Sequence, residues 1–354
     1  MCQKLRWGVL GAGQIAKVFC NALRFSETSE LRAVSSTDPQ RALELGQFSG
    51  ISPRIEHSYD SLLRSHDVDA VYIANLNHQH YPWALASLQA GKHTLVEKPI
   101  TLNEEQLHHL HRVAKQEQRI LMEAFMYRCH PQLDHLRNHI EKETIGKINM
   151  MNASFGYQAA FNPQNRLFQK VWGGGAIYDV GCYPSSMAIW LSSILTKNDC
   201  PQSIKVRRFD VKGRIGPSGV DEEAELCFVL DDGTLIRLQT SIVRELPNQV
   251  ILEGSHGRII VKDPWLPSSS CRFADAPLAL NTVFSPSELL IEQVEGDKNI
   301  FNIERIDVDR DLFTYEIDHF AEIVAQRSPS KIPLQDSLAN IQLLEHWLGA
   351  LHKS

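Results

Sequence analysis

Residues Trp7–Ala16 read WGVLGAGQIA, a short apolar run followed by a glycine turn and the start of a helix. Gly11 permits the tight turn, Gly13 lets a phosphate approach the backbone, and the small Ala16 lets the helix pack close to the strand. The helix N-terminus offers free N–H groups and a positive dipole end to an anion. A glycine turn can also bind nothing, but this order of elements predicts a dinucleotide site. Its expected contacts here are Gly11, Gly13, Gln14 and Ile15.

Strand and helix patterns alternate from this motif to about residue 125. Short apolar runs of the buried parallel-strand type occur at Leu31–Ser36, Ala70–Ala74 and Thr94–Val96, with helical segments between them. Alternating β and α elements indicate an α/β fold. We therefore predict a Rossmann domain with a doubly wound parallel sheet over residues 1–125.

The pattern changes in the second part of the chain. Apolar and polar residues alternate over 224–230, a tight turn follows at Asp231–Gly233, and a second run covers Leu235–Leu238. The runs Val250–Leu252 and Arg258–Val261 flank another glycine-containing turn. These are hairpin signals. They predict an open, mostly antiparallel sheet.

Residues 126–354 are therefore expected to form a second, α+β domain for substrate binding and oligomerisation. A helix over 336–352 could pack back on the first domain, and residues 273–305 show no clear pattern. The expected ligand site is a crevice between the domains, at the carboxyl ends of the parallel strands.

Composition limits the classes of partner. The 354-residue chain has a net charge of −6 and no long basic run, so nucleic acid is not an expected partner. No apolar run approaches the roughly 20 residues of a membrane span. Residues 1–6 lead directly into the first strand without a signal-peptide pattern, which predicts a cytoplasmic protein.

Cysteine and histidine positions bear on the cellular compartment and on metal binding. Seven cysteines are dispersed without a CxxC pair, which indicates free thiols in a reducing compartment. They are Cys2, Cys20, Cys129, Cys182, Cys200, Cys227 and Cys271. The spacing of His108, His109 and His111 does not place all three on one helix face, so no metal site is expected.

The end of the second strand bears on the choice of dinucleotide. NAD-specific folds place an acidic residue there to bind the ribose hydroxyls. Here Ser36 and Thr37 occupy the contact positions, and Asp38 before Pro39 is explained as a helix cap. Hydroxyls accept a 2′-phosphate, and Arg41 could neutralise it. We predict NADP, with NAD possible and with Arg41 as an ordinary surface residue as the alternative.

Two further segments carry candidate chemistry. Lys98, in Glu97–Pro99, falls at the carboxyl end of a predicted parallel strand, although a solvated strand end would look the same. Pro99 suggests a fixed, possibly cis, peptide that aims the lysine. In the glycine-rich segment Gly173–Pro184, Asp179 and Tyr183 are four residues apart and share a helix face. A helix cap and a packed aromatic residue are the alternative interpretation.

Together these segments resemble the glucose–fructose oxidoreductase / inositol dehydrogenase (Gfo/Idh/MocA) family. The resemblance implies an N-terminal Rossmann domain and a C-terminal open sheet that often mediates oligomerisation. A homodimer through that sheet is therefore expected, with a tetramer left open. The matching segments are Gly11–Ala16, Asp69–His80, Ala90–His93, Glu97–Pro99, Gly173–Pro184, Val220–Glu222, Leu246–Asn248 and Gly254–Ile259.

The resemblance also assigns residues. Many sugar and inositol dehydrogenases of the family carry His where this chain has Tyr183. In Tyr183 and in the stretch Ala124–Pro131, the chain resembles the subgroup of trans-1,2-dihydrobenzene-1,2-diol dehydrogenases and NADP-dependent D-xylose dehydrogenases. The family lysine maps onto Lys98 and its aspartate onto Asp179. Thr37 stands where NADP users often have Arg, which leaves NADP open. Further implied cofactor contacts are Ala74, Asn75, Leu76, Asn77, His80, Glu97 and Lys98.

A mechanism follows from these residues. Oxidising an alcohol removes a hydride, which nicotinamide accepts, and a proton, which a base must take. Tyrosine has a reference pKa of about 10, and a nearby ammonium lowers it. We predict Tyr183 as acid/base assisted by Lys98, with Asp179 orienting Lys98 or a substrate hydroxyl. Residues that could contact substrate, or equally pack, are Tyr127, Arg128, Phe161, Arg166 and Trp172.

The sequence therefore predicts an NAD(P)-dependent dehydrogenase acting on a sugar, polyol or dihydrodiol. Neither the substrate nor the reaction direction is fixed by sequence. One alternative within the family is a glycosidase that oxidises its substrate transiently with tightly held NAD. Another is a non-catalytic NADP-binding regulator. The joint presence of Lys98, Asp179 and Tyr183 favours an enzyme.

Overall fold

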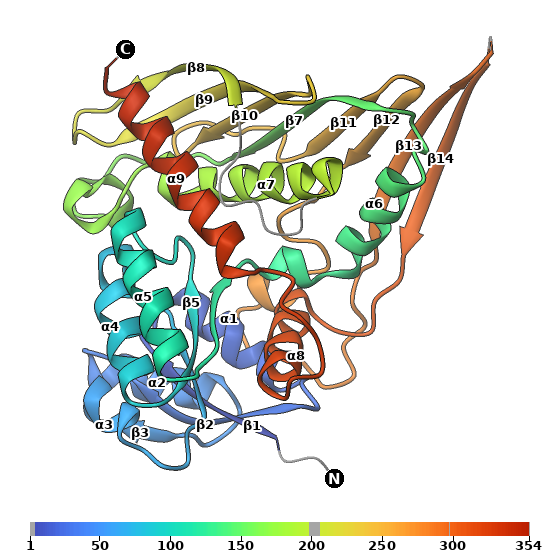
Figure 1. The fold of residues 1–354 in the computed structure, drawn as a ribbon. Helices are drawn as coiled ribbons and strands as arrows, with labels where there is room; N and C mark the ends of the chain where they lie inside the picture. The colour runs from blue at the N-terminus through green and yellow to red at the C-terminus, as the bar shows by residue number, and fades with distance from the viewer. Residues whose placement is uncertain (1–3, 198–205, 297, 354) are drawn as a thin grey trace.

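The computed structural model describes residues 4–197, 206–296 and 298–353. Its first half holds a six-stranded sheet in the order β3-β2-β1-β4-β5-β6, with every neighbouring pair parallel. This confirms the predicted doubly wound sheet (Figure 1). The strands are β1 (Leu5–Leu10), β2 (Ser29–Ser35), β3 (Arg54–Glu56), β4 (Ala70–Ile73), β5 (His93–Glu97) and β6 (Leu121–Ala124).

Helices follow the strands of this sheet in turn. The Asp38 carboxylate accepts from the Gln40 N–H at 2.9 Å and Pro39 is the first helical residue, so the predicted cap of α2 is confirmed. Strands β4 and β5 are almost wholly buried because helices cover the sheet. The helices are α1 (Gln14–Leu23), α2 (Pro39–Phe48), α3 (Tyr59–Leu63), α4 (Asn77–Gln89) and α5 (Glu104–Gln116).

The second sheet has eight strands in the order β14-β13-β12-β11-β7-β10-β9-β8. All neighbours are antiparallel except β7 and β10, and both predicted hairpins, β9–β10 and β11–β12, are confirmed. The strands are β7 (Ile148–Gly156), β8 (Val206–Ile215), β9 (Asp221–Leu230), β10 (Leu235–Ser241), β11 (Val250–Gly254), β12 (Gly257–Val261), β13 (Ser287–Glu295) and β14 (Lys298–Ile306).

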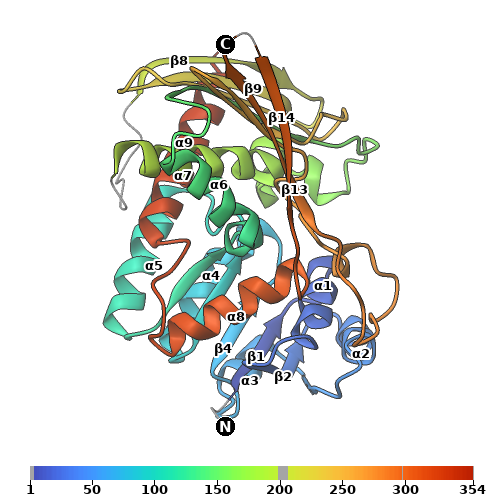
Figure 2. The ribbon, with the colours of Figure 1, turned by 90° about the vertical axis from the view of Figure 1, so that its right-hand side faces the viewer.

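Helices fill the space between the two sheets (Figures 1 and 2). Helix α7 packs on β7 and β10, and the C-terminal helix α9 contacts α7 and β8 as well as α5 and β6 of the first half. Helix α8 packs on α1. The bounds are α6 (Pro131–Glu141), α7 (Cys182–Thr196), α8 (Leu312–Val324) and α9 (Leu334–Leu351). Short turns are η1 (Met126–Cys129), η2 (Arg166–Phe168), η3 (Lys170–Trp172), the π-helical η4 (Ile177–Gly181) and η5 (Cys271–Phe273).

Strands β13 and β14 lie in the segment that showed no sequence pattern. Strand β14 is the edge of the sheet, and nearly all of its residues are exposed. A strand without a buried face has no need for alternating apolar residues, so it carries no period-2 signal.

Three further observations concern the described residues. Cys20, Cys129, Cys182, Cys227 and Cys271 are free, whereas Cys2 and Cys200 lie outside the described residues. No helix in the described part of the chain combines the length and apolar character that a membrane crossing needs. Within the same residues no group of three His, Cys, Asp or Glu side chains could hold a metal ion.

Helix α8 carries a buried acid in the core. Glu316 is fully buried, and neither carboxyl oxygen has a hydrogen-bond partner among the residues that the structure describes. Burial, reinforced by Glu97, raises the pKa of Glu316 well above its ordinary value. Because an unpaired buried charge costs far more than a buried neutral acid, burial favours the protonated form of Glu316.

Replacing Glu316 with Met should raise the free energy of unfolding at pH 7 by about 1–3 kcal/mol, because an unsatisfied polar group leaves the core at nearly constant volume. The unfolded carboxyl loses its proton near pH 4.5, whereas the folded one keeps it to higher pH. The unfolded state then binds fewer protons, so Glu316 makes stability fall as pH rises above about 4.5. Urea titrations at pH 5 and pH 8 should show a smaller fall in Glu316→Met and Glu316→Gln. An unchanged fall in both variants would contradict this account.

Candidate functional site

The glycine turn lies between the ends of β1 and β4. Gly11 has φ +100°, and a Cβ there would lie 2.6 Å from the Ala74 carbonyl oxygen, so only glycine fits. Gly13 precedes α1 without a side-chain cap, and a Cβ on it would meet nothing within 4 Å. The first N–H groups of α1 therefore have no side-chain cap as an acceptor. This arrangement fits a pyrophosphate.

Residues after β4 lie next to the glycine turn at the carboxyl ends of the parallel strands. His80 is buried, with Nδ1 2.7 Å from the Pro99 carbonyl oxygen and Nε2 3.2 Å from that of Asn75. Burial lowers the pKa of His80 to about 4, so the imidazole is neutral. The buried Nδ2 of Asn75 has no partner among the described residues, which leaves a donor for a ligand. Asn77 donates to the Gly173 carbonyl at 2.9 Å, which joins the two halves. Leu76 is half-buried beside them.

The predicted ribose-side residues lie together after β2. Ser36 is buried and its hydroxyl accepts from the Asp38 N–H at 3.2 Å, whereas Thr37 is exposed. The Arg41 guanidinium donates to the Ala12 carbonyl at 3.1 Å, so it reaches back to the glycine turn. Tyr59, which no sequence motif marks, donates to the Asn75 side chain at 3.3 Å. Two hydroxyls and a cation thus surround the place expected for the adenosine ribose.

Lys98 leaves the end of β5 and reaches the second half of the chain. Its Nζ donates to the Asp179 carbonyl oxygen at 2.7 Å and lies 3.9 Å from the Asp179 carboxylate. The same Nζ lies over the Tyr183 ring, 5.1 Å from its centroid. The peptide before Pro99 is cis, as the sequence suggested. The three residues predicted for the chemistry are therefore brought together.

Asp179 is a buried carboxylate held in its ionised form. Burial alone would raise its pKa, but Lys98, Arg166 and a hydrogen bond from Tyr157 hold the pKa at about 2. Arg166 Nη2 lies 3.0 Å from Oδ1, and the Tyr157 hydroxyl donates to Oδ2. With two cations and a phenol around it, Asp179 stays charged and fixes the position of the Lys98 ammonium.

Tyr183 is buried, 5% exposed, and its hydroxyl is 3.9 Å from the sulfur of Met126, a weak acceptor. Burial, and then the negative charge of Glu97, raises its pKa well above the ordinary value. The expected lowering of this pKa is therefore wrong in this structure, because desolvation is the largest influence on Tyr183. Four aromatic rings enclose Tyr183 at centroid distances of 5.1–6.0 Å, those of Phe125, Tyr127, Phe155 and Trp265.

Glu97, predicted as a cofactor contact, lies next to Lys98 at the end of β5. It is buried, accepts from the Tyr72 hydroxyl, and accepts from the Lys98 N–H at 3.3 Å. Burial raises the pKa of Glu97, although Lys98 opposes the shift. This carboxyl therefore orients the backbone that carries Lys98.

The residues considered for substrate contact are placed differently from one another. Arg128 is buried and donates to Asp336 at 2.7 Å and to the Lys331 carbonyl at 3.0 Å, which ties η1 to α9. Tyr127 is fully buried and donates to the Tyr183 carbonyl at 3.4 Å. These two side chains are packed into the protein, away from solvent.

The other three lie nearer the surface. Arg166 pairs with Asp179 as described, and Phe161 is 51% exposed with its ring 5.0 Å from that of Phe168. Trp172 is partly buried and stacks on His78 with centroids 6.3 Å apart. They lie on the loop between β7 and η4, which also carries the glycines that approach α4.

Several residues at the site had no signal in the sequence. Tyr157 follows β7 and bonds Asp179, and Trp265 encloses Tyr183 and donates to the Ser154 carbonyl at 2.9 Å. Arg272 is exposed, and its charge favours ionisation of Glu97, Tyr157 and Tyr183. Arg272 and Trp265 come from the connection between β12 and β13, which is not a regular element and so shows no periodicity.

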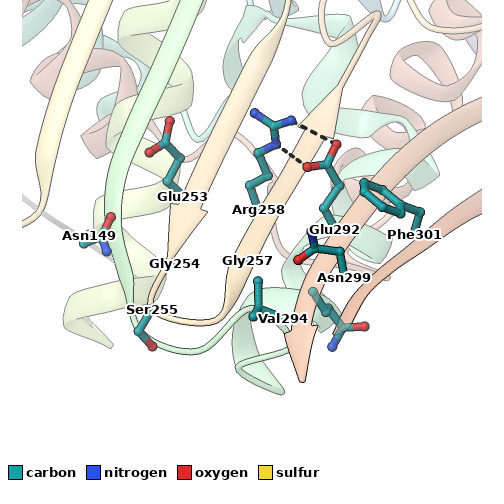
Figure 3. A pocket seen from close by; sticks show the side chains of 11 residues that line it. Asn149, Glu253, Gly254, Ser255, Gly257, Arg258, Glu292, Val294, Asn299 and Phe301 are labelled. Atoms are coloured by element: carbon teal, nitrogen blue, oxygen red, sulfur yellow. Dashed lines mark hydrogen bonds and ion pairs between the residues drawn. The ribbon is translucent and has the colours of Figure 1, made fainter. Parts of the chain in front are cut away.

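A cavity of about 450 Å³ lies elsewhere. It is lined by exposed and half-buried residues of β7 and β11 to β14, on the sheet face opposite the helices (Figure 3). Arg258 and Glu292 pair across it at 2.5 Å. Residues predicted for cofactor or chemistry do not line it.

Comparison with known proteins gives a consistent result. A model described as an oxidoreductase family with an NAD-binding Rossmann fold (GFO_IDH_MocA) matches residues 5–125, and a GFO/IDH/MocA C-terminal domain matches residues 133–260. Trans-1,2-dihydrobenzene-1,2-diol dehydrogenase of Xenopus tropicalis is 30% identical over 267 residues, covering 75% of this chain and 77% of that protein.

Two solved structures share the fold over nearly the whole chain. A 3-ketoreductase from Actinomadura kijaniata, in complex with NADP and TDP-benzene, has a TM-score of 0.81 at 24% identity and covers 99% of this chain and 98% of its own. An aldose-aldose oxidoreductase from Caulobacter crescentus, complexed with glycerol, has a TM-score of 0.81 at 19% identity with the same coverage. At these identities the likeness shows the fold alone.

Proposed function

The chain belongs to the Gfo/Idh/MocA oxidoreductase family, and from this premise we propose that it transfers a hydride between NADP and a secondary alcohol of a sugar, polyol or dihydrodiol. The observation that carries the proposal is the meeting of Lys98 with Asp179 and Tyr183. These side chains come from both halves of the chain, beside the strand ends that would hold the cofactor.

Each side chain has a distinct part in this proposal. Bound nicotinamide would accept or supply the hydride. The Lys98 ammonium, held by Asp179, stabilises negative charge that develops on the substrate oxygen. Tyr183 exchanges the proton with that oxygen, since Met126 holds its hydroxyl only weakly. Arg166 and Tyr157 keep Asp179 ionised and so keep Lys98 in place.

The raised pKa of Tyr183 favours its role as an acid over its role as a base. A phenol with a pKa well above 10 carries its proton at neutral pH and is ready to donate it to a forming alkoxide. We therefore expect carbonyl reduction to be fast near neutral pH. Alcohol oxidation should rise with pH as the phenol approaches ionisation.

The purified protein should change the absorbance of reduced nicotinamide with at least one class among aldoses, inositols and trans-dihydrodiols, or with the matching carbonyl compounds. Tyr183→Phe and Lys98→Met should lower kcat by about 10²–10⁴-fold, because each removes a group that acts on the reacting oxygen. Fluorescence titration should show NADPH affinity within a few-fold of wild type.

Tyr315→Phe is the matched control, because the hydroxyl of this α8 residue donates to the exposed Asp309, just before the helix, at 3.0 Å. It should keep full activity. Full activity in Tyr183→Phe would exclude the tyrosine from proton transfer. If no alcohol or carbonyl compound changes the absorbance although the cofactor binds, the proposed dehydrogenase activity is contradicted.

We also propose NADP as the preferred dinucleotide. No carboxylate is free at the ribose position, because Asp38 caps α2, whereas Ser36, Thr37 and Arg41 offer hydroxyls and a cation. A 2′-phosphate is favoured by such groups and repelled by an acid. The ketoreductase of the same fold was crystallised with NADP, which is in keeping with this choice.

Substituting Ser36→Asp should shift the ratio of kcat/KM for NADP over NAD toward NAD by about 10–100-fold, because a carboxylate repels the 2′-phosphate and can bond ribose hydroxyls. Ser36→Ala is the matched variant without charge and should shift the ratio less. Steady-state rates with both cofactors give the measurement. An unchanged ratio in Ser36→Asp would place the 2′-position elsewhere.

We further propose a homodimer through the outer face of the second sheet. This face of the described structure lacks a helix layer, and Val294, Phe301 and Ile303 on β13 and β14 are 49%, 69% and 59% exposed. Phe301 and Ile303 share a face because side chains alternate along a strand. A second copy would bury this apolar strip beside the cavity of Figure 3.

Sedimentation equilibrium of wild type should give twice the mass of the chain. Phe301→Glu should shift the protein to monomer, because a charge would be buried at the interface. Phe161→Glu, which changes an exposed phenylalanine on the loop after β7, should stay dimeric. A monomeric wild type would refute the dimer.

A further inference from the structure

Asp221 holds the start of the helix that carries Asp179 and Tyr183. It is the first residue of β9, is 1% exposed, and its Oδ2 accepts from the Ile177 N–H at 2.6 Å. Ile177 begins the π-helical η4, which continues directly into α7. The first N–H groups of a helix need acceptors, and here the carboxylate of another element supplies one.

The local chain cannot supply this cap itself. Gly175 lies just before the helix with φ +112°, and a Cβ there would come 2.1 Å from Asp221 Oδ1. The ends of η4 show no side-chain cap. Glycine at this position therefore makes room for the carboxylate, which takes the place of a local capping side chain.

A second strand also holds this turn, with a hydrogen-bond donor where Asp221 supplies an acceptor. The Thr240 hydroxyl on β10 donates to the Ala176 carbonyl at 3.1 Å, while Asp221 accepts from the next N–H along the chain. The turn is thus held by one donor and one acceptor from neighbouring strands of the sheet. Asp179 follows Ile177 by two residues and Tyr183 by six, so a small change here moves both.

We propose that Asp221 is a positioning residue, which sets the place of Asp179 and Tyr183 against Lys98 while touching neither substrate nor cofactor. The consequence for the reaction rests on the proposed function. A misplacement of about 1 Å can cost about 10²-fold in rate, so loss of this anchor should appear in kcat. Because Asp221 touches neither ligand in this proposal, KM should change little.

The charge of Asp221 is itself sensitive to pH. Burial raises the pKa of Asp221 to about 7, although backbone N–H groups oppose the shift. Protonation weakens an anionic acceptor at a helix N-terminus. Titratable groups that face it are Lys170, Tyr178 and His352, which line the same cavity of about 220 Å³, and Glu345, which acts on Tyr178.

Hydrogen exchange provides a test that needs no turnover. Amides of residues 176–183 should exchange at least about tenfold faster in Asp221→Ala than in wild type, and by less in Asp221→Asn, whose remaining oxygen can still accept from Ile177. Asp232→Asn is the matched control, since that aspartate accepts from Thr234 in the turn at the far end of β9. Its exchange at 176–183 should equal that of wild type.

Kinetics complete the test. Asp221→Ala should lose about 10–100-fold in kcat with KM and NADPH affinity within about twofold, and Asp221→Asn should lose less. A fall of wild-type kcat on acidification through pH 7 should be absent in Asp221→Asn and present in His352→Gln. Unchanged exchange at 176–183 in both Asp221 variants, or unchanged kcat when exchange rises, would overturn the proposal.

The two proposals fail in different ways. If wild type turns over no substrate, the proposed function fails, and the exchange experiment still decides whether Asp221 anchors the helix. If wild type is active but Asp221→Ala shows a higher KM and a weaker cofactor affinity together with a lower kcat, the positioning role is refuted. In that case Asp221 supports the whole fold. Should Asp221→Ala fail to fold, the comparison rests on Asp221→Asn.

Discussion

The Lys98–Asp179 contact is the interaction on which the site depends, because it joins the two halves of the chain through a buried charge pair. Lys98 ends a strand of the parallel sheet, and Asp179 lies on a helix packed against the other sheet. A pKa of about 2 in place of 3.8 means that the folded protein favours the ionised carboxylate by about 2 kcal/mol. An ionised Asp179 keeps an ammonium beside it, and the ammonium is what a developing alkoxide requires.

Other buried acids around this pair are pushed in the opposite direction. Burial raises the pKa of Glu97, Glu316 and Asp221, whereas Asp179 forms ion pairs with the side chains of both Arg166 and Lys98 and keeps a low pKa. Asp179 therefore stays ionised, whereas the protonated form is favoured in the other three acids. Divergent pKa values in neighbouring groups are a sign of assigned acid and base roles. Tyr183, with its raised pKa, belongs on the proton-holding side.

Sequence reasoning was most successful where local chemistry is imposed by backbone geometry. The glycine turn, the Asp38 cap and the β9–β10 hairpin each need particular residues at fixed spacing, and each was found as predicted. Long-range packing left no such trace. Neither the exposed edge strand β14 nor the aromatic enclosure of Tyr183 can be inferred from neighbours in sequence. The pKa of Tyr183 was misjudged for the same reason, since its desolvation comes from distant elements.

The glycine-rich turn before the helix shows how both halves specify one geometry. Leu102, from the loop after β5, leaves no room for a Cβ at Gly173, and Asp221, from the sheet, leaves none at Gly175. Tyr178 donates to the Leu102 carbonyl at 2.9 Å, and Asn77 donates to that of Gly173. The turn is therefore compressed from the Rossmann side and the sheet side at once. A side chain at Gly173 would press on Leu102 of the first half, and one at Gly175 would press on Asp221 of the second sheet, so either would displace the turn that leads to Asp179.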